Sequence, residues 1–164
     1  MENEEKNVAR EQARLQLDGI VRMVNRLDHA TKCDGGENCE LSGKEIIEGL
    51  GEFYDGGKAT GEQREEYHDA ERAGEAMDED PLSIQLRTGW YTPGEREEAS
   101  EYEILLCTGG PAVRIIGELD KNGQPRRAVL QYQDWHVPWT DYTDMSSEEH
   151  ADLLSYAKHF NFGE

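Results

Sequence analysis

The sequence predicts an α+β fold, with a four-stranded antiparallel sheet, three N-terminal helices and one C-terminal helix. Between residues 82 and 135 apolar residues alternate with a period of two, as in strands with one buried face. Before residue 80 and after residue 146 they recur every three or four residues, as in amphipathic helices. The length of 164 residues suits one domain, with an acidic helical part at 1–80 and the sheet with the last helix at 81–164.

Spacing and capping residues define the first two helices. A first helix is predicted over residues 9–28. A second begins after Ser42, whose hydroxyl can accept a hydrogen bond from the Glu45 N–H while the Glu45 carboxylate reaches back to the Ser42 N–H. The apolar residues of this second helix are expected to form its buried face: Ile46, Ile47, Leu50, Phe53 and Tyr54.

The third helix, predicted over about residues 61–79, is strongly acidic. Residues 61–80 hold nine carboxylates and two arginines. On one continuous helix the carboxylates would follow one another about every 3 Å, close to the roughly 3.4 Å phosphate spacing along a DNA strand. The acidic face of this helix is either a docking surface for a partner or only a solvated surface. The predicted partner-binding residues are these nine acids and two near the C-terminus: Glu62, Glu65, Glu66, Asp69, Glu71, Glu75, Asp78, Glu79, Asp80, Asp141 and Asp144.

Four alternating stretches predict the sheet, at residues 82–91, 102–108, 112–119 and 127–135. Gly109-Gly110 and Asn122-Gly123 supply turns, so the last three strands form a sequential meander. The second face of the sheet is also partly apolar, and we expect a helix to cover it rather than a partner. The apolar sides of the first strand and of the last helix, residues 147–160, are expected to face the core: Leu82, Ile84, Leu86 and Trp90 in the strand, and Leu153, Tyr156, Ala157 and Phe160 in the helix.

The charge restricts the class of partner. Seventeen basic and 36 acidic residues give a net charge of −19, which would repel the phosphates of nucleic acid and of an anionic membrane. A basic protein or nucleoprotein complex is the expected partner, and a second copy of the chain is the alternative. The start of the sequence lacks a basic and apolar leader, so we expect the protein in the cytoplasm of its host cell.

No motif specifies a reaction, and we predict a protein that is not an enzyme, with no catalytic residues and no cofactor. His29, Cys33 and Cys39 could supply three zinc ligands, but their spacing matches no common zinc motif and no fourth ligand is evident. We therefore predict no metal site from the sequence.

Two other groupings keep an enzyme open as an alternative. His68 and Asp69 lie among glutamates that suit a hard divalent metal. Asp134, His136 and Asp141 lie among aromatic residues and could form an acid–base site.

Several runs in the C-terminal half resemble a family of small acidic uncharacterised proteins encoded by bacteriophages, prophages and mobile elements. The runs are Pro81-Leu82-Ser83-Ile84, the stretch 106–115 around Gly109-Gly110-Pro111, Tyr132-Gln133-Asp134-Trp135, and 160–164. The family brings no assigned activity, but small acidic proteins of mobile elements include inhibitors of host defence nucleases. The resemblance thus implies a non-enzymatic inhibitor of a nucleic-acid-binding defence complex, of the anti-CRISPR or anti-restriction type, with DNA mimicry as one means. A dimeric interaction module is a further alternative.

Overall fold

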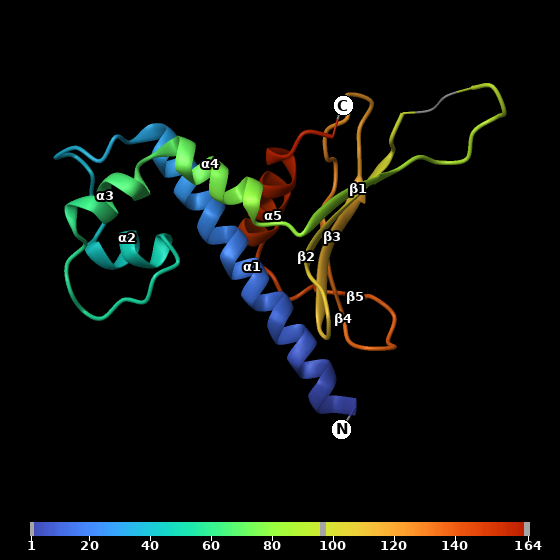
Figure 1. Cartoon of the computed structure of the whole chain (residues 1–164), viewed down its shortest axis with the longest axis horizontal. Helices are drawn as coiled ribbons and strands as arrows, with labels where there is room; N and C mark the ends of the chain where they lie inside the picture. The colour runs from blue at the N-terminus through green and yellow to red at the C-terminus, as the bar shows by residue number, and fades with distance from the viewer. Residues whose placement is uncertain (1, 96–97, 163–164) are drawn as a thin grey trace. The chain divides into compact units, whose positions relative to one another are not determined.

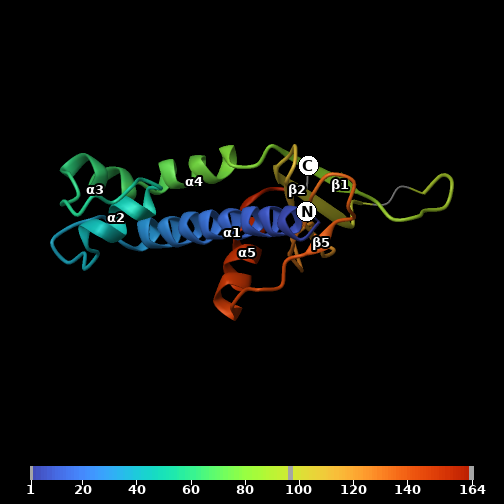
Figure 2. The same ribbon diagram turned by 90° about the horizontal axis from the view of Figure 1, so that it is seen from below.

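A computed structural model describes residues 2–95 and 98–162 of the chain, with side chains from Val8 onward. It is a mixed α+β structure, as predicted (Figures 1 and 2). The chain divides into two compact units, one of residues 1–17 and 80–164 and the other of residues 18–79. Helix α1 (Glu2–Lys32) contributes to both units and extends beyond the predicted 9–28 at each end.

The described part of the first unit contains one antiparallel sheet whose strands follow chain order, β1-β2-β3-β4-β5. The sequential meander is therefore confirmed, and a short fifth strand adds to the predicted four. Gly109 and Gly123, both at positive φ, lie in the predicted turns. The strands are β1 (Ser83–Arg87), β2 (Glu101–Cys107), β3 (Ala112–Glu118), β4 (Val129–Gln133) and β5 (Thr140–Asp141).

The core of this unit lies against one face of the sheet. In β2 every second residue is buried, as the alternation predicts. Helix α5 (Ser147–His159) begins with a capping box between Ser146 and Glu149. Ion pairs of Arg10 with Asp144 and of Arg14 with Glu149 join the beginning of α1 to the α5 end of the chain. All four predicted inward residues around α5 are buried: Leu153, Tyr156, Ala157 and Phe160.

The first strand differs from the prediction in length and burial. It ends at Arg87, and Trp90 beyond it is fully exposed. Ile84 and Leu86 pair in register with the buried Ile104 and Tyr102, so they lie on the core face, yet about 40% of each remains exposed. Ile84 and Leu86 are not buried as predicted, because β1 is the terminal strand of the sheet, where packing on the core face ends. Alternation cannot distinguish an edge strand from a central one.

The second unit contains the rest of α1 with α2 (Gly43–Gly49), α3 (Gly61–Tyr67) and α4 (Ala70–Glu79). The Ser42–Glu45 capping box forms as predicted. Helix α2 nevertheless stops early, because Gly51 follows in the left-handed conformation at φ +79°. Phe53 is consequently 90% exposed rather than inward.

The predicted third helix is two helices. Helix α3 ends at Tyr67, and His68 is its C-terminal cap. Asp69 then begins the next turn, because its carboxylate accepts a hydrogen bond from the Arg72 N–H at 3.1 Å. Buried Arg26 of α1 donates to the carbonyl oxygens of Glu66 at 2.7 Å and Tyr67 at 3.4 Å. The break between α3 and α4 is therefore held by a side chain some 40 residues earlier in the chain. Helical periodicity in the sequence gives no indication of this contact.

Replacing Glu149 with glutamine should lower the free energy of unfolding by about 0.5–1 kcal/mol at neutral pH. Glutamine can keep the capping box but loses the ion pair to Arg14. Hydrogen bonds from Arg14 and Ser146 hold the pKa of Glu149 below its ordinary 4.5. Its stabilising effect is therefore present above pH 4.5 and disappears as the pH falls through the lower folded-state pKa. Urea unfolding should show a difference from wild type at pH 7 that vanishes in acid, and an equal loss at both values would contradict the ion-pair explanation.

Candidate functional site

Four side chains with metal-binding atoms converge in the unit of residues 18–79. His29 comes from the last turn of α1, Cys33 and Cys39 from the loop after it, and His68 from the end of α3. One ligand atom from each residue lies within 4.8 Å of the others. Among the residues that the structure describes, no other group of three or more histidine, cysteine or acidic residues has this geometry.

The two imidazoles present the same nitrogen to the group. His29 Nε2 and His68 Nε2 are 3.3 Å apart. The Cys39 Sγ lies 3.2 Å from His68 Nε2 and 3.7 Å from His29 Nε2. His68 Nδ1 is 2.6 Å from the Arg64 carbonyl oxygen, which can only accept, so Nδ1 carries the proton and donates. The lone pair of His68 therefore lies on Nε2, directed at the other three residues.

Backbone contacts within the loop from Cys33 to Cys39 hold it close to these side chains. The Gly35 N–H approaches the Cys33 Sγ at 3.5 Å, and the Cys39 N–H donates to the Gly36 carbonyl oxygen at 2.9 Å. Gly35 adopts φ +80°, and a Cβ there would lie 2.9 Å from Cγ of His68. Only glycine fits that position without displacing the imidazole. His68 is itself 9% exposed, and the loop side of the group borders a hollow of about 730 Å³.

From the sequence we considered His29, Cys33 and Cys39 as zinc ligands but predicted no metal site, because no fourth ligand was evident. His68 lies 29 residues beyond Cys39, and we grouped it with Asp69 for a hard metal instead. The structure directs Nε2 of His68 toward sulfur, while Asp69 caps α4 and pairs with Arg72. No pattern in the sequence marks His68, because the helical spacing continues through residues 61–79 and gives no sign of the break that places this side chain.

The predicted partner-binding acids fall in both units. Glu62, Glu65 and Glu66 lie on α3, and four others on α4. Because the helix breaks at His68 and Asp69, the even spacing along one helix that suggested DNA mimicry is not present. An acidic hollow of about 520 Å³ lies here instead, defined by five acids with Thr60, Gln63 and Arg72: Glu52, Glu62, Glu65, Glu66 and Asp69.

Asp69 lies between α3 and α4, and the other three acids belong to the unit with the sheet, where each has a polar partner. Asp80 accepts a hydrogen bond from the buried Tyr156 hydroxyl at 2.6 Å, and burial followed by the Asp80 interaction raises the pKa of Tyr156. Asp141 accepts from Gln131 at 2.8 Å, and Asp144 lies 3.2 Å from Arg10. These contacts give Asp80, Asp141 and Asp144 structural roles beside any docking role.

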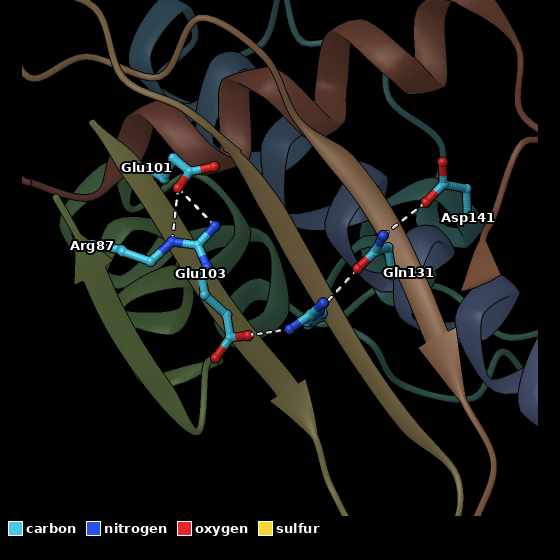
Figure 3. Close-up of polar contacts among 6 residues, drawn as sticks. Arg87, Glu101, Glu103, Gln131 and Asp141 are labelled. Carbon is cyan, nitrogen blue, oxygen red and sulfur yellow. Dashed lines mark hydrogen bonds and ion pairs between the residues drawn. The ribbon is translucent and has the colours of Figure 1, made fainter. Parts of the chain in front are cut away.

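The sheet face opposite the core carries a polar network in place of the helix that we expected there (Figure 3). Arg87 pairs with Glu101 at 2.7 Å on neighbouring strands. Arg114 pairs with Glu103 at 2.6 Å and donates to Gln131 at 2.9 Å. Gln131 in turn donates to Asp141 (Figure 3). This network lines an open hollow of about 540 Å³. Arginines and carboxylates alternate across it, so its charges largely compensate one another.

The acid–base grouping near the end of the sheet is not assembled. Asp134 accepts a hydrogen bond from the Trp135 N–H, and Asp141 accepts from Gln131. Within the described residues neither carboxylate is hydrogen-bonded to the ring of His136. The contacts between carboxylate and imidazole that an acid–base site requires are therefore not formed.

Comparison of the chain with protein-family models, with curated proteins and with solved structures finds no match. In the described part of the chain, no helix has both the length and the apolar character needed to cross a bilayer.

Proposed function

We propose that this chain is a non-enzymatic binding protein that docks its acidic helical surface on a basic partner. We further propose, from the resemblance to proteins of mobile elements, that the partner is a host nucleic-acid-binding defence complex, which the protein inhibits. The observation that carries the proposal is the acidic hollow at α3, where five carboxylates and one arginine share the lining. Lysine or arginine side chains of a partner are the groups that such a surface attracts.

The hollow concentrates negative charge on exposed side chains. Glu62, Glu65 and Glu66 are all exposed, and within the described residues none of the three has an ion pair. Arg72, the one base in the lining, already pairs with Asp69. Carboxylates without basic partners raise the negative potential, which speeds the approach of a basic surface and weakens with salt.

Binding is preferred over catalysis because the structure offers little for chemistry around the acids. The acid–base grouping near His136 is not assembled, and the His68 ring is directed at cysteine sulfur. The arrangement on α3 and α4 is open and charged, which suits contact with a large surface. Because the acids do not follow one continuous helix, we propose general electrostatic docking rather than the mimicry of a DNA strand.

Reversing Glu62, Glu65, Glu66 and Glu75 together to lysine should weaken binding to the partner by at least about 30-fold, since four exposed ion pairs of about 0.5 kcal/mol each amount to about 2 kcal/mol. Asp69 is left unchanged because it caps α4. The measurement is capture from a lysate of cells that carry defence systems, elution with a salt gradient, and titration of the purified partner.

A control variant carries four reversals elsewhere, at the exposed Glu11, Glu95, Glu98 and Glu148, and should bind within a few-fold of wild type. Duplex DNA should compete with the protein for the captured partner if a nucleic-acid channel is the target. Binding that is insensitive to salt, or equal weakening in both quadruple variants, would contradict docking through α3 and α4.

A further inference from the structure

We propose that His29, Cys33, Cys39 and His68 bind one zinc ion, which fixes the loop of residues 33–39 to the end of α3. The proposal concerns a metal site, and it stands or falls independently of the basic partner. Its basis is the convergence of four ligand atoms of two kinds from three separate segments of the chain.

The distances among the ligand atoms of His29, Cys39 and His68 are close to those around a tetrahedral zinc ion, and the Cys33 Sγ lies within 4.8 Å of all three. With bonds of about 2.0–2.1 Å to nitrogen and about 2.3 Å to sulfur, two nitrogens lie about 3.3 Å apart and a nitrogen and a sulfur about 3.6 Å apart. His29 Nε2 and His68 Nε2 are 3.3 Å apart. The Cys39 Sγ is 3.7 Å from one and 3.2 Å from the other.

The contacts around the ligands also fit a metal site. His68 donates through Nδ1 to the Arg64 carbonyl oxygen, the kind of contact that orients a zinc-bound imidazole and leaves Nε2 for the metal. The Gly35 N–H points at the Cys33 Sγ, where it would stabilise a thiolate. Gly35 itself packs against the His68 ring.

The ligand types select the metal. Two thiolates and two imidazoles in a tetrahedral arrangement suit zinc, whereas calcium and magnesium require oxygen ligands. Four protein ligands leave no open position for water or substrate, so the site is structural rather than catalytic.

The unit that contains these four residues, 18–79, has a small hydrophobic core, which a metal cross-link would supplement. Within the described residues 18–79, only six apolar side chains are buried: Ile20, Ile46, Ile47, Tyr67, Ala73 and Met77. A unit of roughly 60 residues with so small a core is marginal without a metal, a disulfide or a partner. Helices α2 and α3 have seven residues each, too short to be stable alone.

The test is zinc titration of the full-length protein, reduced and stripped with a chelator, against a chromophoric competitor. Wild type should bind one zinc ion per chain. Cys39→Ser should bind at least 100-fold more weakly, whereas Cys107→Ser, in β2, and His150→Ala, on α5, should match wild type. Cobalt should substitute with an absorption spectrum typical of tetrahedral thiolate coordination.

A second pair of variants keeps the test decisive if Cys39→Ser fails to fold. Gly35→Ala should weaken zinc binding about tenfold, because the new methyl group displaces the His68 ring. Gly56→Ala is matched, since Gly56 also has positive φ, at +94°, but has open space around it, and its zinc affinity should stay within twofold of wild type. All three tryptophans lie at residue 90 or later, so their fluorescence verifies the sheet unit in every variant.

The proposal is overturned if the reduced wild-type protein takes up no zinc. That result would leave the four side chains as a hydrogen-bonded cluster, in which the Cys39 thiol donates to His68 Nε2. Equal zinc affinity in wild type and Cys39→Ser, or in Gly35→Ala and wild type, would also overturn it.

Discussion

Replacing Gly117 with alanine should lower the free energy of unfolding by about 3 kcal/mol or more. A Cβ at this position in β3 would lie 1.9 Å from the Arg127 carbonyl oxygen and 2.7 Å from the Tyr102 hydroxyl. The carbonyl belongs to the main chain, so no side-chain rotation can relieve the contact. The buried Tyr102 also donates to this carbonyl at 2.6 Å, and the methyl group would separate the pair.

Urea unfolding followed by tryptophan fluorescence, for the sheet unit, and by far-ultraviolet circular dichroism, for both units, measures the effect of Gly117→Ala. Two variants separate its causes. Tyr102→Phe removes the hydrogen bond alone and should cost about 1–2 kcal/mol. Gly61→Ala adds a methyl group in open space at the start of α3 and should change stability by less than about 0.5 kcal/mol. A loss below about 1 kcal/mol in Gly117→Ala would show that the strands adjust, and the close-approach argument would then be wrong.

Removing zinc should open the segment between the ligands while leaving the sheet intact. His29 and His68 are 39 residues apart in the chain, and closing a loop of roughly 40 residues with a cross-link is worth about 4 kcal/mol in the chain-entropy description. That energy corresponds to a several-hundredfold change in an opening equilibrium. We therefore expect amide hydrogen exchange in α2 to become at least tenfold faster when the metal is removed.

The measurement compares peptides from the two units with and without chelator. The Ile46 N–H, bonded to the Ser42 carbonyl oxygen at 3.1 Å, and the Leu50 N–H, bonded to the Ile46 carbonyl oxygen at 3.0 Å, report on α2. Amides of the β2–β3 ladder serve as the internal control and should exchange at an unchanged rate. Unchanged exchange in α2 would mean that the small core holds this unit without the metal.

The features that could be predicted from the sequence are those decided over a few neighbouring residues. The capping boxes at Ser42 and Ser146 form as expected, because a cap needs only residues three positions apart. The meander follows from side-chain alternation and two glycine turns. The buried face of α5 follows from its helical spacing.

Errors arose where a distant segment decides the local structure. The break at His68 and Asp69 is held by Arg26 of α1, and uninterrupted helical spacing gave no sign of it. The exposure of Ile84 and Leu86 depends on β1 being the terminal strand. The polar network opposite the core requires Arg114 to meet Glu103 and Gln131 from neighbouring strands.

The sequence by itself determined the fold class, the order of the three strands of the meander and the strong negative charge, because periodicity, turn residues and charge counts are properties of the chain alone. It also brought His29, Cys33 and Cys39 together as possible zinc ligands, since they lie within eleven consecutive residues, but it led us to predict no metal site. Only the tertiary structure decided that His68 joins them and that five carboxylates share one hollow at α3. Both depend on the packing of α1 and the following loops against α3, which brings together atoms that no local pattern relates.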